Sequence, residues 1–456
     1  MSTAYQEFLE KKSHTGNSFG FEPIWMPDFL IDFQAALTHW SIIKGRGAIY
    51  ADCGLGKSPM ALVWAQNVVR KINRPVLILT PLAVVQQFTR EASKFQIECE
   101  RINGGPPTKP GIFVTNYEKL HLFDPEDWGG VDLDEGSAIK NMAGSRRAQV
   151  TTFLRKVPYR LLCTATAAPN DYTELGTASE ALGEMGLSDM LSRFFRDDAG
   201  RAIAQGGRFN AKWRFKGHSE KPFWQWICSW ARACRKPSDL GFSDARFVLP
   251  PLIENDHVVI PRTKQPGRLF NIAARNMQEE REERRRTIPE RCEKAAELAT
   301  SNESPVVTWC HLNDEGDLLE KLIPESRQIK GSQCDDEREE IYEAFGMGQL
   351  KRIIIKDRIG AYGLNWQFCS RVIRFATHSY EADYQAVRRC WRFGQDNPVT
   401  VDRIMTEGEE GIRDNLRRKS QNADRMFTEL VGFMNDALRI DRRSNFIEKE
   451  TVPAWL

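Results

Sequence analysis

Short apolar runs separated by amphipathic stretches recur through the first part of the chain. The runs occupy residues 47–50, 75–80, 111–115, 131–134 and 160–164. Each run has the length of a buried strand, and the stretches between them have the apolar spacing of helices. Short buried strands that alternate with helices are typical of a parallel sheet covered by helices on both faces. The pattern therefore predicts an α/β fold.

The same rhythm returns in the last third of the chain. Residues 304–310, 351–356 and 370–375 have the pattern of buried strands, and helical stretches separate them. A second α/β region therefore follows the first. The chain beyond residue 407 is expected to be helical and then irregular.

The interval between these two parts has a different character. Its first half is rich in aromatic and basic residues, and its second half carries the charge run 279–286, which we expect to form a solvated helix. This organisation predicts three regions. They are a first lobe over residues 1–170, a largely helical insertion and linker over 171–289, and a second lobe over 290–456 that ends in a helical tail.

Composition excludes several classes of protein. The 456 residues include 41% hydrophobic and 28% charged residues, and the formal net charge is +2, so any nucleic-acid surface must be local rather than global. The ten cysteines form no Cys-x-x-Cys pair, which argues against both a zinc site and a disulfide framework. No apolar run has the length of a membrane span, and residues 1–12 lack the apolar core of a signal peptide. We expect a cytoplasmic protein.

The stretch 51–58, Ala-Asp-Cys-Gly-Leu-Gly-Lys-Ser, combines the groups that a phosphate cradle needs. It lies between a predicted strand and a predicted helix, which is the context of a P-loop. Gly54 and Gly56 would let backbone N–H groups approach the phosphates of a nucleotide without a Cβ in the way. Lys57 would reach the β- and γ-phosphates, and the Ser58 hydroxyl would ligate Mg²⁺. The alternative is a glycine-rich turn that carries a lysine by chance.

An acidic pair at the end of the predicted strand 131–134 is a second candidate site. Asp134 would hold Mg²⁺ directly or through water, and Glu135 would polarise the attacking water. Because successive side chains of a strand point to opposite sides, one carboxylate could face the metal and the other the nucleophile. Asp132 interrupts a strand that should be buried, so it needs a partner or an exposed edge. A surface acidic pair at a strand end is the alternative.

The order of these stretches resembles that of the superfamily 2 helicases, in particular the Swi/Snf-type translocases and the short helicases of phages and prokaryotes. Residues 33–34, Phe-Gln, look like the adenine-reading Q-motif, and residues 51–58 are similar to motif I. The other matches are residues 80–82 with motif Ia, 134–137 with motif II, 164–166 with motif III, 360–365 with motif V and 385–395 with motif VI.

This resemblance implies two RecA-like parallel-sheet lobes with the insertion between them, ATP and Mg²⁺ as cofactors, and DNA as a partner. Gln34, Gly363 and Gln385 would contribute to ATP binding. Arg389 and Arg392 of motif VI would act as arginine fingers on the γ-phosphate. Two arginines three residues apart would share one face of a helix, so both could point into one cleft. A basic surface helix is the alternative.

Motif II departs from the family's pattern. It reads Asp-Glu-Gly-Ser over residues 134–137, without the His that some relatives use to link motif II to motif III. We expect this departure to affect the rate of turnover and the coupling between motifs, and to leave the reaction itself in place.

Nucleic-acid contacts are predicted in two places. The resemblance implies phosphate contacts from Thr80 and Pro81, from residues 115–117, and from Gly331 with the loop after it. Residues 193–236 interleave basic and aromatic side chains, which suits base stacking together with phosphate neutralisation. Trp224, Ile227 and Trp230 lie at helical spacing within that segment, which instead favours a buried core for these three residues.

We therefore predict an ATP-dependent translocase or helicase that moves along duplex or forked DNA, with replication, recombination or defence proteins as candidate partners. One alternative is an RNA-dependent ATPase of the same fold. Another is an ATP-gated clamp that serves as a scaffold and moves nothing. A nuclease is disfavoured, because no second cluster of acidic residues and lysine accompanies Asp134 and Glu135.

Overall fold

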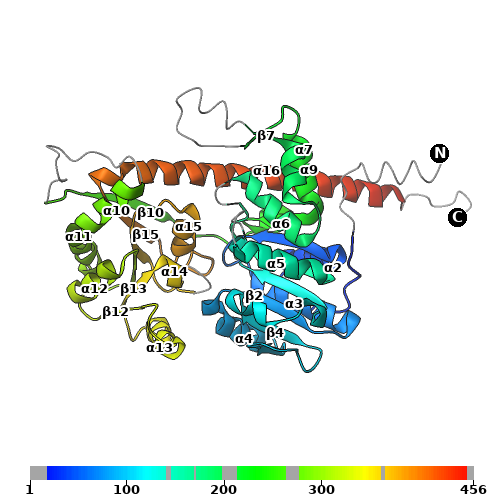
Figure 1. Cartoon of the computed structure of the whole chain (residues 1–456), viewed down its shortest axis with the longest axis horizontal. Coiled ribbons are helices and arrows are strands. Elements are labelled where there is room, and N and C mark those ends of the chain that lie inside the picture. The colour runs from blue at the N-terminus through cyan, green and yellow to red at the C-terminus, as the bar shows by residue number, and fades with distance from the viewer. Residues whose placement is uncertain are drawn as a thin grey trace, which may run out of the picture. The chain divides into compact units, whose positions relative to one another are not determined.

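The computed structural model describes residues 18–139, 145–168, 171–197, 213–262, 277–360 and 365–448. Its contacts divide the chain into two compact units (Figure 1). Unit 1 combines Met1–Asp244 with Asn422–Leu456, and unit 2 is Ala245–Gln421. The first unit is therefore built from two separate parts of the chain.

The centre of unit 1 is a parallel sheet to which the described residues contribute seven strands. Their order across the sheet is β3 (Cys99–Arg101), β4 (Ile112–Asn116), β2 (Val76–Thr80), β5 (Gly130–Asp134), β6 (Tyr159–Thr164), β1 (Arg46–Ala51) and β9 (Ala231–Cys234). All residues of β2, β4 and β5 are buried. Burial on both faces is the reason why these strands are nearly continuous apolar runs in the sequence.

Helices pack around this sheet. They are α2 (Asp32–Lys44), α3 (Lys57–Ile72), α4 (Val85–Lys94), α5 (Ser145–Lys156), α6 (Leu175–Leu182), α7 (Leu187–Phe194) and α9 (Glu220–Trp230). The last of them buries Trp224, Ile227 and Trp230. The prediction that these three residues form a core is therefore confirmed.

Two short antiparallel strands, β7 (Phe195–Asp197) and β8 (Trp213–Phe215), accompany α9. The rings of Phe195 and Phe215 stack with their centroids 4.6 Å apart. Both rings also contact Phe223 of α9, at 5.4 and 5.2 Å. The aromatic residues of this segment thus stabilise unit 1 by packing on one another.

A second parallel sheet forms the centre of unit 2. Its order in the described residues is β10 (Leu252–Val259), β15 (Val399–Thr406), β14 (Arg371–Phe375), β11 (Val306–Cys310), β13 (Arg352–Lys356) and β12 (Ser326–Gln328). Val307 and Trp309 belong to one buried cluster, and Val306 and Cys310 belong to another. Because neighbouring residues of a strand face opposite sides, apolar side chains cover both faces of this sheet.

The helices of unit 2 are α10 (Met277–Arg286), α11 (Ile288–Thr300), α12 (Asn313–Leu322), α13 (Asp335–Gly346), α14 (Asp357–Gly360) and α15 (Tyr380–Val387). The charge run is helical as predicted, but one of its carboxylates is not solvated. Glu283 in α10 is buried, and its Oε1 accepts a hydrogen bond from Thr406 Oγ1 at 3.1 Å. Part of the run therefore packs against β15.

The unit boundaries lie at Asp244 and Gln421, and so differ from the predicted boundaries at residues 170 and 289. The boundary at Asp244 reflects two strands in the interval that was expected to be mainly helical. Ala231–Cys234 pairs with β1, and Leu252–Val259 pairs with β15. Each sheet thus takes an outer strand from this interval.

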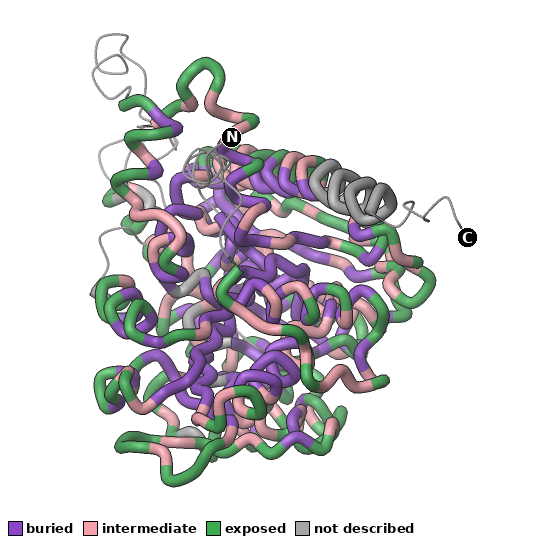
Figure 2. The backbone as a smooth tube through the Cα atoms, turned by 90° about the vertical axis from the view of Figure 1, so that its right-hand side faces the viewer, coloured by how far each residue is buried: buried purple, intermediate pink, exposed green. Residues whose placement is uncertain are grey.

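One helix, α16 (Glu410–Glu448), belongs to both units. In unit 2 its Ile412 is buried with Ala376 and Met405. In unit 1 its buried residues recur at helical spacing, and Figure 2 shows them as purple turns between green, exposed ones. They are Ala423, Met426, Phe427, Leu430 and Met434. Among the described residues, α16 included, no helix combines the length and apolar character that a membrane span requires.

Candidate functional site

The loop between β1 and α3 has the backbone of a phosphate cradle. Gly54 and Gly56 have φ angles of 86° and 80°, in the left-handed region that favours glycine. A Cβ on Gly56 would also lie 2.3 Å from Gln34 Nε2. Lys57 and Ser58 begin α3, so the free N–H groups of this helix terminus are directed at the loop. This arrangement suits a bound anion.

Two polar side chains hold the loop in place. Gln34 of α2 is buried, and its Nε2 donates a hydrogen bond to the Leu55 carbonyl at 2.9 Å. Lys57 Nζ donates to the carbonyls of Ala51 and Asp52 at 2.9 and 3.3 Å. The glutamine predicted to bind the nucleotide therefore contacts the phosphate loop itself, and the lysine lies over the end of β1.

Asp134 is buried at the end of β5. Its Oδ2 accepts a hydrogen bond from Thr80 Oγ1 at 2.9 Å, and its carbonyl accepts one from the Tyr117 hydroxyl at 2.7 Å. Burial, reinforced by the charge of Glu135, raises the pKa of Asp134 to about 7, although Thr80 and Lys57 oppose the rise. A cation at this carboxylate would displace its proton, because carboxylate ligands bind metals in the deprotonated form.

Glu135 lies beyond the strand, which corrects the prediction for the acidic pair. Strand β5 ends at Asp134, and Glu135 has a φ of 56°, so the alternation of side chains along a strand does not extend to it. Thr164 Oγ1, at the end of β6, donates to Glu135 Oε2 at 3.4 Å and accepts from Thr166 N at 3.1 Å. This contact links the residues of motif II and motif III without a histidine.

The structure explains two departures from the expected sequence pattern. They are Gly136 in motif II and Asp132 in the strand before it. A Cβ on Gly136 would lie 2.4 Å from Leu162 Cγ, so the glycine allows β6 to pack closely. Asp132 has no exposed edge, because β5 lies between β2 and β6. Burial, together with the Asp134 charge, raises the pKa of Asp132 well above its usual range. Burial thus favours the protonated form of this carboxyl group, against an opposing hydrogen bond from Cys163.

In unit 2, the prediction that Arg389 and Arg392 share a helical face is wrong. Helix α15 ends at Val387, before both arginines. The Arg389 carbonyl instead accepts a hydrogen bond from Trp366 N, a residue outside α15, at 3.0 Å. Arg389 is buried, and its Nη2 donates to Gln385 Oε1 at 2.8 Å. Arg392 is half-buried.

A buried ionic network fixes the helix that carries Gln385. Asp383 of α15 accepts from Arg403 Nε and Nη2 at 3.2 and 3.0 Å, and it pairs with Arg374 Nε at 3.0 Å. Burial alone would raise the pKa of Asp383, but the two arginines lower it below its usual value. Arg374 Nη2 also lies 3.4 Å from Asp357 Oδ2. One buried arginine thus connects α15 with the start of α14.

The sequence did not identify this network. Its signal was a charged residue inside an apolar run, Arg374 within 370–375, and an acidic residue directly after one, Asp357. Gly363, which the resemblance assigned to nucleotide binding, lies outside the described residues, as does most of motif V.

Phosphate contacts from the side chains of Thr80 and of residues 115–117 are disfavoured, whereas those from Pro81 stay a prediction. The side chains of Thr80, Thr115, Asn116 and Tyr117 are all buried. Three of them make internal contacts: Thr80 and Tyr117 bind Asp134, and Asn116 Oδ1 accepts from the Lys119 backbone N–H at 3.1 Å. Gly331 of unit 2 is exposed, so its backbone remains a candidate.

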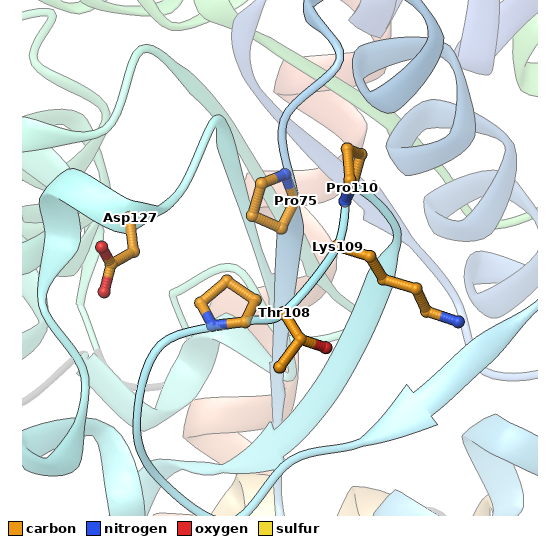
Figure 3. Close-up of a pocket in the computed structure, with 6 residues that line it drawn as sticks. Pro75, Thr108, Lys109, Pro110 and Asp127 are labelled. Carbon is orange, nitrogen blue, oxygen red and sulfur yellow. The ribbon is translucent and has the colours of Figure 1, made fainter.

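A hollow of about 230 Å³ lies at the other end of the unit 1 sheet (Figure 3). It is lined by Pro75, Pro107, Thr108, Lys109, Pro110 and Asp127. Pro75 precedes β2 and Pro110 precedes β4, whereas the phosphate loop and Asp134 lie at the carboxyl ends of β1 and β5. Ligands of parallel α/β sheets bind at the carboxyl ends, so this hollow is separate from the candidate site.

Comparison with known proteins gave matches in both units. Residues 290–394 match the helicase conserved C-terminal domain. The chain is 24% identical over 413 residues to the putative ATP-dependent helicase/translocase YwqA of Bacillus subtilis, covering 80% of this chain and 44% of that protein. It is 24% identical over 175 residues to the SWI/SNF chromatin-remodeling complex subunit snf22 of Schizosaccharomyces pombe, covering 33% of this chain and 10% of that protein.

A solved structure has a similar fold. It is the helicase Lhr of Mycobacterium smegmatis bound to ssDNA and AMP-PNP, with a TM-score of 0.50 and 16% identity, covering 86% of this chain and 47% of that chain. The prediction of an α/β protein with two RecA-like parallel-sheet lobes is confirmed. The chain spans less than half the length of the curated relatives it matches.

Proposed function

We propose that this chain, which is similar to the superfamily 2 helicases of the Swi/Snf type, hydrolyses ATP and uses the energy to move along DNA. The observation that carries the proposal is the arrangement at the carboxyl ends of β1, β5 and β6. There, the phosphate loop with Lys57, the buried Asp134 and the Thr164-bound Glu135 lie on neighbouring strands of one sheet.

The residues present fit a nucleoside triphosphate with Mg²⁺. Ser58 and Asp134 offer oxygen ligands, and Mg²⁺ in such enzymes is held by one or two carboxylates together with substrate phosphates. The part of the chain that the structure describes contains no group of three or more His, Cys, Asp or Glu that could hold a metal alone. When bound, Mg²⁺ supplies charge neutralisation of the phosphates.

The protein groups would then act in sequence. Lys57 and the backbone N–H groups of the loop would bind the phosphates, and Glu135, held by Thr164, would accept a proton from the attacking water. Arg389 and Arg392 would stabilise the negative charge that develops in the transition state. Because these arginines belong to the other unit, hydrolysis would be coupled to relative motion of the two units.

We take duplex DNA as the polymer, on the strength of the Swi/Snf-like motif VI. The two alternatives differ in what stimulates hydrolysis. An RNA-dependent ATPase would respond to RNA alone. An ATP-gated clamp would bind ATP and nucleic acid without turnover.

ATP hydrolysis by the wild type and by Glu135→Gln tests the proposal, with no nucleic acid, duplex DNA, single-stranded DNA or RNA. Duplex DNA should stimulate the wild type, and the substitution should lower kcat by at least about 100-fold while ATP binding persists, because the general base is lost. Glu126→Gln, an exposed position of the same unit, is the matched control. The proposal would be contradicted if RNA alone stimulated hydrolysis, or if the protein bound ATP without turnover on any polymer.

A further inference from the structure

The β7–β8 pair has two unlike faces. Phe195 lies opposite Phe215, and Arg196 lies opposite Arg214. The two phenylalanines stack on each other and on Phe223 of α9. Because successive residues of a strand alternate between faces, the two arginines lie on the face turned away from this aromatic cluster. Both arginines are exposed.

Further cations flank β7 and β8 in the sequence. Arg193, Lys216 and Lys221 are also exposed. Arg193 lies 5.6 Å from the ring of Phe194, and Lys216 Nζ donates to the Ser192 carbonyl. Like charges placed directly opposite each other on a sheet are unfavourable. The packing of Phe195 and Phe215 nevertheless holds Arg196 and Arg214 opposite each other on the exposed face, next to the exposed Asp197 that ends β7.

We propose that this exposed face of β7 and β8 binds the phosphate backbone of the nucleic acid on which the proposed function acts. The phosphates of a nucleic acid form a closely spaced row of negative charges, which complements cations fixed side by side. Phe195 is buried, and Phe215 is half-buried and packs on Phe195 and Phe223, so both rings are engaged in packing within unit 1. The contact is therefore electrostatic and independent of sequence, and it does not use the base stacking that the interleaved sequence suggested.

The double variant Arg196→Gln/Arg214→Gln tests this proposal. Affinity for a labelled 30-bp duplex is measured by fluorescence anisotropy without nucleotide, between about 50 and 200 mM salt. Loss of two phosphate contacts should reduce the slope of log K against log salt by about 1.8 and weaken binding at every salt concentration. ATP hydrolysis without nucleic acid should stay unchanged, because neither arginine is part of the proposed catalytic groups.

Two further variants interpret the result. Arg101→Gln/Arg155→Gln removes two exposed arginines elsewhere in unit 1 and should retain the wild-type slope. Arg196→Lys/Arg214→Lys keeps both positive charges and should retain most of the wild-type slope.

The inference would be overturned if Arg196→Gln/Arg214→Gln kept the wild-type salt slope. It would also be overturned if Arg101→Gln/Arg155→Gln reduced the slope by the same amount. Both outcomes would leave the proposed function in place. A wild type that binds no nucleic acid would overturn both. If Arg196→Gln/Arg214→Gln also lost ATP hydrolysis in the absence of nucleic acid, the two arginines would have a structural role and the inference would be overturned.

Discussion

At the scale of single residues, the hydroxyl of Thr164 holds the carboxylate that would activate water. Thr166 N donates to Thr164 Oγ1 at 3.1 Å, and the hydroxyl in turn donates to Glu135 Oε2 at 3.4 Å. The backbone N–H occupies a lone pair of the oxygen, which leaves its hydrogen for the carboxylate. Both side chains are buried. Thr164 is therefore a positioning residue for Glu135.

Thr164→Val removes this hydroxyl and keeps the shape of the side chain. We expect kcat for ATP to fall by about 10- to 150-fold, because a hydrogen bond to a charged group contributes about 1.5–3 kcal/mol. KM for ATP should change by less than about twofold, since the residue does not touch the nucleotide in this proposal. Steady-state hydrolysis at saturating duplex DNA measures both constants. Thr164→Ser restores the hydroxyl, so an equal loss in that variant would contradict the assignment.

At the scale of elements, the carboxyl ends of β11, β13 and β14 meet in a partly buried polar cluster. His311, directly after β11, has its Nδ1 3.5 Å from Asp357 Oδ2 and its Nε2 3.1 Å from the Ala376 carbonyl oxygen. Burial lowers the pKa of His311, with Arg284 and Arg374 adding to this effect and Asp357 and Glu315 opposing it. The folded state thus keeps this imidazole neutral below its usual pKa.

This shift predicts a pH dependence of stability. As the pH falls below about 6.5, the unfolded chain binds a proton at His311 that the folded chain does not, so the free energy of unfolding decreases. The decrease from this residue cannot exceed about 1.4 kcal/mol per pH unit. Urea unfolding between pH 5.5 and 7.5 should show a weaker dependence in His311→Gln. His121→Gln, an exposed histidine, should match the wild type; equal slopes in all three proteins would refute the assignment.

At the scale of the whole molecule, helix α16 completes the core of unit 1. Leu430 and Met434 are fully buried. The Leu430 carbonyl accepts from Cys228 Sγ at 3.8 Å, and Met434 Sδ accepts from Ala233 N at 3.5 Å. Residues about 200 positions apart in the sequence therefore share one core.

Leu430→Ala should lower the free energy of unfolding of unit 1 by about 2–5 kcal/mol, through lost burial and the cavity left behind. Differential scanning calorimetry would show this as a lower Tm for the transition that includes unit 1. Thr428→Ala, an exposed position on the same helix, is the control for helix propensity. A shift for Leu430→Ala no larger than that of the control would argue against a core role.

The inner strands of both sheets could be predicted from the sequence because burial on two faces requires unbroken apolar runs. The outer strands β9 and β10 could not, because pairing with β1 and β15 decides their structure and their own pattern is mixed. The same holds for the candidate site. The glycines of the phosphate loop are visible in the sequence, whereas the φ of Glu135 and the end of α15 depend on contacts with distant residues.

Unit 1 is built from two separate parts of the chain, and this affects how it folds during synthesis. Chains are synthesised from the N-terminus at about 5–20 residues per second, so the intervening unit, Ala245–Gln421, takes roughly 9–35 s to translate. During that time the surface around Cys228 and Ala233 lacks the helix that covers it. Until α16 has been synthesised, unit 1 therefore exposes an apolar surface that chaperones or other nascent chains could bind.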